Sequence, residues 1–160
     1  MVALARDELA PRAGLPPERI RLGAIEHLDG RFDTVLCFNV LTNSPHYGQP
    51  LERLLRAARK RLLLRESLGD ELVVRYTPEP YLDEGKRHIR VYHNQYPLEE
   101  VAELMRAEGF QVTPIRDERT QDREEMVVDI PHRWRILLAE RVAGFAGHME
   151  FGCAELPGDV

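Results

Sequence analysis

The segment Phe32–Phe38 constrains the fold more than any other part of the chain, because it is the clearest β-strand in the sequence. From Val35 onward it is apolar on both faces, which is typical of an inner strand covered by helices on both sides. The polar run that follows, at residues 43–48, contains Asn, Ser, Pro and Gly and indicates a loop. We therefore expect an α/β architecture in which this strand lies inside a sheet.

Other strands and helices are expected to alternate along the chain. They are the end of a helix at Val2–Leu9, a short strand at Ile20–Ala24, a helix from about Pro50 to Lys60, a strand at Leu62–Leu64, a helix from Pro97 that stops at Gly109, and strands at Phe110–Ile115 and Trp134–Ala139. Alternation of this kind predicts a mostly parallel sheet with helices on its faces. Only a polar loop separates the last two strands, so the last strand is expected to run antiparallel.

Two segments fall outside this alternation. Residues 68–95 contain prolines, tyrosines and histidines without helical or strand periodicity, and we interpret them as an insertion on the substrate side of the sheet. The tail at residues 144–160 has glycines and no periodicity, so we expect it to be loosely ordered. One domain is therefore expected at residues 1–143.

Composition restricts the class of protein. A chain of 160 residues with 43% hydrophobic content is long enough for one domain with its own core. The formal net charge of -5 gives no support for nucleic acid as a partner. Cys37 lies in an apolar run and Cys153 in the tail, so the two cysteines do not form a disulfide framework. No apolar run is long enough for a membrane span or a signal peptide. We expect a cytoplasmic protein that binds no membrane.

The run at residues 30–41, with Phe32 and Asp33 opening the strand, resembles the fourth-strand motif of class I S-adenosylmethionine-dependent methyltransferases. The neighbouring elements follow the order of that family, including the Glu-Gly-Phe turn at residues 108–110 and a closing pair of strands. The resemblance covers roughly residues 2–141. It implies a partial doubly wound, Rossmann-like sheet, mostly parallel with an antiparallel last strand, in which this chain supplies the third to seventh strands.

The glycine-rich loop that holds the cofactor in such enzymes is absent from this sequence, which contains no Gly-x-Gly pattern. The second strand, with its ribose-binding acidic residue, is absent as well. The resemblance therefore implies the carboxyl-terminal part of a longer or completed methyltransferase, with S-adenosylmethionine as the cofactor of the complete domain. It places cofactor contacts at Ala24 and Ile25, after the third strand, and at Asn39 and Val40, after the fourth.

Polar residues that follow the predicted strands are candidates for binding a small or medium-sized methyl acceptor. They are Thr42, Asn43 and Tyr47 in the loop, Arg65 and Glu66 after Leu64, and His88, Tyr92 and His93 in the insertion, which could form a lid. His46 is a candidate general base because the ordinary pKa of histidine lies near neutrality. Several of these residues also have a plainer interpretation. His46 would be a solvated loop residue, the Asn39 side chain would hydrogen-bond to backbone groups of its own loop, and Arg65 and Glu66 would take part in an exposed ion pair. No compact set of metal ligands is present.

Two alternatives remain open at this stage. The chain is either part of a catalytic methyltransferase or a non-catalytic methyltransferase-like scaffold or regulatory partner. Without the first two strands, Ile20–Ala24 loses its support and Phe32–Phe38 loses a neighbour, so we also expect a homo-oligomer or a partner that supplies the missing strands.

Overall fold

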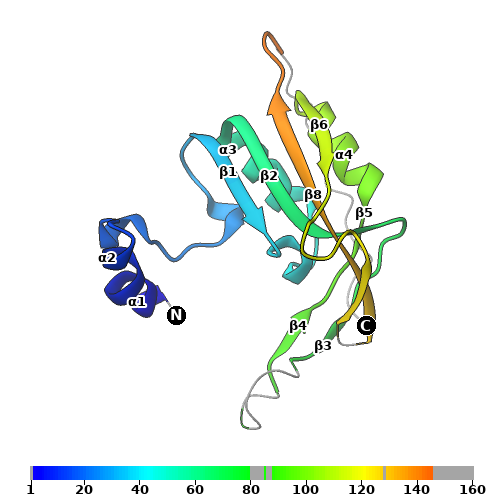
Figure 1. The fold of residues 1–160 in the computed structure, drawn as a ribbon, viewed down its shortest axis with the longest axis horizontal. Coiled ribbons are helices and arrows are strands. Elements are labelled where there is room, and N and C mark those ends of the chain that lie inside the picture. Colours follow the sequence, from blue (N-terminus) through cyan, green and yellow to red (C-terminus); the bar gives the residue numbers. More distant parts are fainter. Residues whose placement is uncertain (1, 80–84, 86–87, 128, 146–160) are drawn as a thin grey trace.

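A computed structural model describes residues 2–79, 85, 88–127 and 129–145. Its main sheet has the strand order β1-β2-β8-β6, formed by Phe32–Phe38, Ala58–Gly69, Ile130–Arg141 and Phe110–Ile115 (Figure 1). Strands β1 and β2 pair in parallel, whereas β8 is antiparallel to both β2 and β6. The α/β class, the mixed sheet and the antiparallel last strand are as the sequence predicts.

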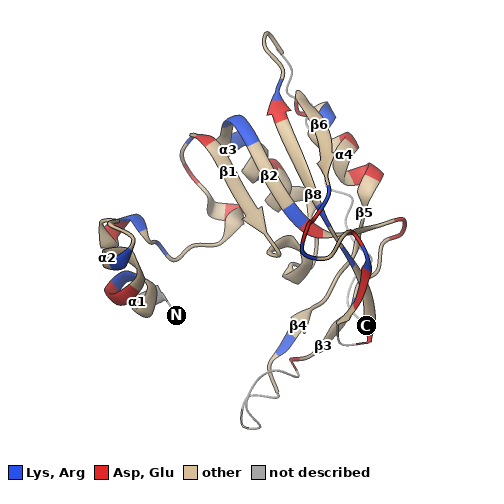
Figure 2. Cartoon of the chain, in the orientation of Figure 1, with Lys and Arg blue, Asp and Glu red and all other residues tan. Residues whose placement is uncertain are grey.

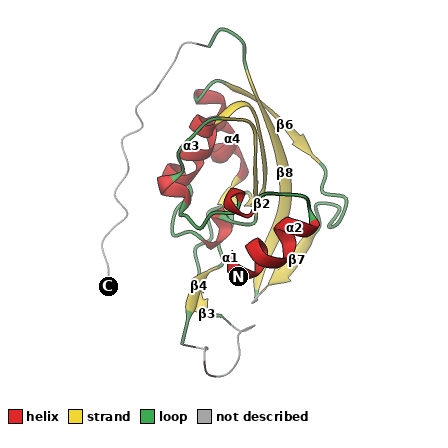
Figure 3. Cartoon of the chain, turned by 90° about the vertical axis from the view of Figure 1, so that its left-hand side faces the viewer, coloured by secondary structure: helices red, strands yellow, loops and turns green. Residues whose placement is uncertain are grey.

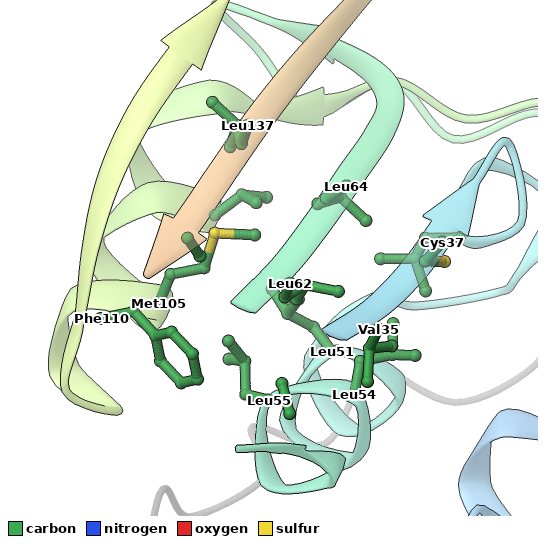
Figure 4. Close-up of a cluster of buried hydrophobic side chains, with 14 of the residues drawn as sticks. Val35, Cys37, Leu51, Leu54, Leu55, Leu62, Leu64, Met105, Phe110 and Leu137 are labelled. Atoms are coloured by element: carbon green, nitrogen blue, oxygen red, sulfur yellow. The ribbon is translucent and has the colours of Figure 1, made fainter. Parts of the chain in front are cut away.

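Two amphipathic helices cover the same face of this sheet (Figure 3). They are α3, Gly48–Ala57, and α4, Leu98–Ala107. Leu51, Leu54 and Leu55 of α3 are buried against the sheet because they recur at helical spacing. Figure 4 shows this core, in which Leu62 of β2 lies next to the leucines of α3 and to Met105 of α4.

The opposite face of the sheet is uncovered by any helix among the described residues, which corrects the expectation that β1 is an inner strand. Val35 and Cys37 point to the core, but Phe32, Leu36 and Phe38 are 50%, 62% and 47% exposed. Strand β1 is an edge strand. The sequence predicts burial on both faces because Leu36 and Phe38 are apolar. An apolar side chain can nevertheless remain exposed when no other element covers it.

The predicted strand at Ile20–Ala24 is wrong: this stretch is extended but joins no sheet. A strand needs a neighbouring strand for its backbone hydrogen bonds, and no strand of the described residues pairs with this stretch. The preceding helix is present and longer than expected, as α1 Val2–Leu4, a π-helical turn Ala5–Leu9 and α2 Ala10–Arg12. Figure 1 shows it standing apart from the sheet.

Helix α3 is shorter, and β2 longer, than the apolar pattern predicts. The helix ends at Ala57, so Lys60, the last residue of the predicted helix, lies on β2. Lys60 Nζ forms an exposed ion pair with Asp33 Oδ2 of β1 at 2.7 Å. Pairing of Ala58 with β1, and of Arg61 with both β1 and β8, overrides the helical propensity of this stretch.

The carboxyl-terminal half also contains more strand than expected. Strand β8 begins at Ile130 and not at Trp134, because its first residues pair with β7, Glu124–Val127, inside the predicted polar loop. Helix α4 and β6 are confirmed, and Gly109 after α4 has a φ of 82°, a conformation that favours glycine.

As far as they are described, residues 68–95 contain the end of β2 and a two-stranded hairpin. Strands β3, Tyr76–Pro78, and β4, Arg90–Tyr92, pair antiparallel and extend away from the main sheet (Figure 1). The short strand β5, Tyr96–Pro97, then returns the chain to β2. Residues 80–84 and 86–87 of this predicted insertion, and most of the predicted tail, lie outside the described residues.

Within the described part of the chain, no helix is both long and apolar enough to cross a membrane.

Candidate functional site

The candidate site lies at the carboxyl ends of β1 and β2. In open α/β sheets, ligands bind beyond this edge because the loops that follow neighbouring parallel strands converge there. The loop after β1 turns at Asn39 and continues into a 3-10 turn, Leu41–Asn43. Asn39 has a φ of 55°, a left-handed conformation that asparagine tolerates better than most residues.

Glu66 of β2 holds this loop in place. Its Oε1 accepts hydrogen bonds from the backbone N–H of Val40 at 2.8 Å and of Leu41 at 3.0 Å. Its Oε2 accepts from the N–H of Thr42 at 3.0 Å and from Thr42 Oγ1 at 2.7 Å. Glu66 has 0% of its surface exposed. Both carboxylate oxygens are therefore used within the protein, and the turn after β1 is tied to the end of β2.

Burial raises the pKa values of two neighbouring groups, Glu66 of β2 and Cys37 of β1. Burial raises the pKa of Glu66, and the hydrogen bonds from Thr42, Leu41 and Val40 oppose that rise because they favour the charged form. Burial and the neighbouring Glu66 also raise the pKa of Cys37 to about 12. Cys37 is therefore a neutral thiol, and its Sγ donates to Glu66 Oε1 at 3.7 Å.

A second group of side chains fastens the other side of the loop. The Asn94 N–H donates to Thr42 O at 2.9 Å, and Asn94 Nδ2 donates to Ser44 O at 2.7 Å. The hydroxyl of Tyr96 lies 3.0 Å from Leu41 O and 2.7 Å from Ser44 O. Sequence analysis missed Asn94 and Tyr96. The one feature of the sequence that could have indicated them is that they follow His93, a residue predicted to lie near the site.

Arg65 links Asn39, which follows β1, to Asp117, which follows β6. Its Nη1 donates to Asn39 Oδ1 at 2.6 Å, and its Nε and Nη2 donate to Asp117 Oδ2 at 2.9 and 2.6 Å. The guanidinium also lies 5.1 Å from the centre of the Trp134 ring. Burial raises the pKa of Asp117, but the hydrogen bonds from Arg65 and the Arg119 N–H outweigh it, so that pKa is lowered overall. The predicted exposed ion pair between Arg65 and Glu66 is not formed.

An apolar groove runs along the outer edge of β1. It has a volume of about 350 Å³ and is lined by Ile25, Leu28, Phe32, Thr34, Val35, Leu36, Cys37, Phe38, Val40 and Leu54. Two residues that the resemblance assigns to the cofactor, Ile25 and Val40, thus face the same space. Ala24 is exposed beside Ile25. A larger hollow of about 690 Å³, lined by residues that include Arg31, Arg56 and Arg141, belongs to a different part of the surface.

Two buried imidazoles lie near the end of β2. Ser67 Oγ is 2.8 Å from His132 Nδ1, and His132 stacks on Trp134 with their ring centres 5.2 Å apart. Among the described residues, neither His132 Nε2 nor His93 Nε2 has a hydrogen-bond partner, although Glu79 Oε2 lies 3.9 Å from His93 Nε2. Burial, with a smaller contribution from His93, lowers the pKa of His132 to about 4. His132 is therefore neutral near pH 7.

The remaining candidates are spread around this edge. His46 and Asn43 are exposed in the loop, and Asn43 Nδ2 donates to Asn39 O at 3.0 Å. The Tyr47 hydroxyl donates to Glu100 Oε2 of α4 at 3.0 Å, while its ring packs 4.7 Å from Tyr96. His88 is exposed on the hairpin, and Tyr92 packs against Tyr76 there. In the parts of the chain that are described, no cluster of three or more His, Cys, Asp or Glu could hold a metal ion.

Comparisons with known proteins show which solved structures share this fold. No protein-family model matches this sequence, and no curated protein matches it. The structure of YcgJ from Bacillus subtilis is 17% identical, with a TM-score of 0.53 over 90% of this chain and 79% of that one. A SAM-dependent methyltransferase from Methanosarcina mazei is 10% identical, with a TM-score of 0.53 over 76% of this chain and 66% of that one. These similarities establish a shared fold.

Another similar structure is considerably longer than this chain. The magnesium protoporphyrin IX methyltransferase of Synechocystis, solved with bound SAM, is 21% identical over 75% of this chain, with a TM-score of 0.42. The matched part is 44% of that protein, so the chain spans about half the length of this relative.

Replacing Glu66 by Gln tests whether its carboxylate stabilises the loop. The amide keeps the size of the side chain but points an N–H₂ group at donors of the loop, so one of these donors loses its acceptor. We expect the free energy of unfolding in urea to fall by about 1–3 kcal/mol. Glu140→Gln, at an exposed position of β8, is the matched control and should change it little. Equal stability of the two variants would contradict the role given to Glu66.

The buried His132 makes stability depend on pH. Its pKa of about 4 in the folded protein lies below the ordinary 6.5, so between these values the unfolded chain binds more protons than the folded one. Stability is therefore fully present above pH 6.5 and falls as the pH drops toward 4, by up to about 3 kcal/mol from this residue. His132→Asn should remove that part of the pH dependence in urea unfolding, whereas His46→Gln, at an exposed position, should retain it. Identical pH profiles for both variants would refute the assignment.

Proposed function

We propose that this chain, which has the fold of class I S-adenosylmethionine-dependent methyltransferases, is the carboxyl-terminal part of such an enzyme. In a longer or completed domain it would transfer a methyl group to a small or medium-sized acceptor. One observation carries the proposal: Glu66 fixes the turn at residues 40–42 at the carboxyl edge of β1, where a ligand of this fold binds. Such a turn can meet a cofactor without reorganising, which saves binding free energy.

The residues at this edge suit part of an S-adenosylmethionine site. Ile25 and Val40 line an apolar groove that could pack against the adenosine, and Ala24 is exposed beside them. The Asn39 carboxamide uses its oxygen to accept from Arg65, which leaves its N–H₂ group to donate to a ligand. The cofactor would supply an activated methyl group on a sulfonium. The glycine-rich loop would have to come from outside these 160 residues.

We assign acceptor binding to the polar residues around the same edge. Arg65 holds Asn39 and Asp117, so it orients the edge, while Glu66 and Thr42 act through the loop because their polar groups are used there. The side chains proposed to contact the acceptor are Asn43, His46, Tyr47, His88, Tyr92 and His93. Of these, His46 is exposed in the loop and is proposed to remove a proton from the acceptor. Catalysis would otherwise depend on holding the acceptor in line with the methyl group.

The absence of a glycine-rich loop supports a second candidate, a non-catalytic scaffold or regulatory partner with the same fold. Either form would be cytoplasmic and would act without nucleic acid. The two candidates differ in whether the edge at Asn39 binds the cofactor at all.

Titration of the ¹⁵N-labelled 160-residue chain with S-adenosylhomocysteine tests the proposal. Because only part of the site is present, we expect weak binding, in the millimolar range, with amide shifts confined to Ala24, Ile25 and residues 39–42. Asn39→Gly keeps the left-handed backbone available but removes the carboxamide, so it should reduce these shifts.

Gln121→Gly provides the matched control, because Gln121 also has a positive φ, of 56°, and lies outside the candidate site. It should leave the shifts unchanged. Shifts elsewhere on the sheet, or none at residues 39–42, would refute the cofactor site and favour the scaffold. Micromolar binding would contradict the view that half of the site lies outside this chain.

A further inference from the structure

The hollow of about 690 Å³ lies at the opposite edge of the sheet from the candidate site. Its lining comes from the loop before β1, the last turns of α3, the turn after α4 and the end of β8. The parallel strands begin at this edge and reach the candidate site at their carboxyl ends. The seven residues of β1 separate the two edges by about 20 Å. The volume is typical of a small-molecule site.

Four arginines from three parts of the chain line this hollow. Arg31 precedes β1, Arg53 and Arg56 lie on α3, and Arg141 is the last residue of β8. Only two carboxylates line it with them. The lining is therefore positive, although the whole chain has a net charge of -5. Figure 2 shows Lys and Arg at the start of β2 and at the end of β8, both at this end of the sheet.

The charges of these arginines are poorly compensated within the described chain. Neither Arg31 nor Arg53 has a hydrogen-bond or ion-pair partner among the described residues, although Arg53 is partly buried. The one described ion pair of Arg56 is with Glu52 of its own helix, at 3.5 Å. Exposed pairs of this kind are weak, so Arg56 also remains able to bind an anion.

Arg141 is oriented by a backbone carbonyl group and an aromatic ring. Its Nη2 donates to Leu55 O at 3.0 Å, and its guanidinium lies 4.2 Å from the centre of the Phe110 ring. Burial and the nearby positive charge of Arg31 lower the pKa of Arg141, and Glu108 opposes this change. Arg31 and Arg141 are therefore close enough to repel each other, and an anion bound beside both would offset that repulsion.

The dipole of α3 explains only part of this cluster. A basic residue in the last turn of a helix is favourable, which accounts for Arg56. It does not account for Arg31 and Arg141, which belong to other parts of the chain. Guanidinium groups have planar donors that match the oxygens of a phosphate group in pairs. Their convergence on one hollow therefore favours a phosphate as ligand.

The rest of the lining fits a ligand that also carries hydroxyl groups. Asp29 is exposed and can accept a hydrogen bond. Glu108 is 4% exposed, and its Oε1 has no hydrogen-bond partner among the described residues. A buried carboxylate oxygen without a donor costs free energy, so a hydroxyl group that reached it would bind favourably. The ring of Phe145 packs against Gly109 and gives the hollow an apolar wall.

We propose that this hollow binds a small sugar phosphate. The arginines bind the phosphate group, and Asp29 and Glu108 accept hydrogen bonds from the sugar hydroxyls. The ligand occupies the edge of the sheet opposite the proposed cofactor site, so it does not compete with S-adenosylmethionine. All of the lining residues belong to the described chain, from Leu28 to Phe145.

Titration calorimetry on the full 160-residue chain at low salt tests the ligand class with ribose 5-phosphate, inorganic phosphate and ribose. We expect a dissociation constant on the order of 100 µM for ribose 5-phosphate. Inorganic phosphate should bind at least about fivefold more weakly, because it lacks the hydroxyl groups. Ribose should not bind, because it lacks the charge. Added salt should weaken the binding of the sugar phosphate.

The double variant Arg31→Gln, Arg53→Gln tests the assignment to this hollow. It should weaken the binding of ribose 5-phosphate by about tenfold or more, because two charged donors are lost. Arg12→Gln combined with Arg19→Gln is the matched control, since it removes the same charge at exposed positions outside the hollow. It should leave the affinity nearly unchanged.

Amide shifts of the unaltered ¹⁵N-labelled chain give a second readout that does not depend on the variants. Ribose 5-phosphate should shift residues 28–31, 108–109 and 141–143 and leave residues 39–42 in place. Because the cofactor is read from residues 39–42, this proposal and the proposed methyl transfer can fail separately.

Four results would overturn the proposal. They are no binding of ribose 5-phosphate, equal losses of affinity in the two double variants, equal affinity for inorganic phosphate and ribose 5-phosphate, and shifts at residues 39–42 in place of the hollow. Tighter binding of a single-stranded oligonucleotide than of ribose 5-phosphate would also contradict it, since the arginines would then form a nucleic-acid surface.

Discussion

A single buried carboxylate, that of Glu66, joins the ends of the two parallel strands on which the candidate site depends. Three backbone N–H groups and one hydroxyl of residues 40–42 donate to its two oxygens. A loop at the end of a strand would otherwise leave these donors to water. Because Glu66 is completely buried, its desolvation must be offset by these hydrogen bonds, so the loop and the carboxylate stabilise each other.

The rest of the site is arranged around this fixed turn. Asn94 and Tyr96 hold its far side, and Arg65 links its first residue, Asn39, to Asp117 and Trp134. The result is a rigid polar edge next to an apolar groove, which suits a ligand with a polar and an apolar part.

Sequence reasoning worked best where local pattern decides the structure. The bounds of β1 and β6 follow from apolar runs closed by polar residues or turns, and α4 from its apolar stripe between Pro97 and Gly109. It failed where tertiary contacts decide. Ile20–Ala24 has strand-like residues but no neighbouring strand, and Leu36 is apolar yet exposed because no helix of the described chain covers it. The role of Glu66 could not be predicted either, since a charged residue after an apolar run usually reaches solvent.

Amide hydrogen exchange at residues 40–42 of this chain tests the central claim most directly. Val40 is exposed, so exposure alone would let its N–H exchange quickly, whereas the bond to Glu66 Oε1 at 2.8 Å should slow it. We expect the amides of Val40, Leu41 and Thr42 to exchange only on unfolding of the sheet, at the rate of core amides such as Leu64. Fast exchange at these three residues, with β1 and β2 protected, would show that Glu66 does not hold the turn and would remove the basis for the proposed site.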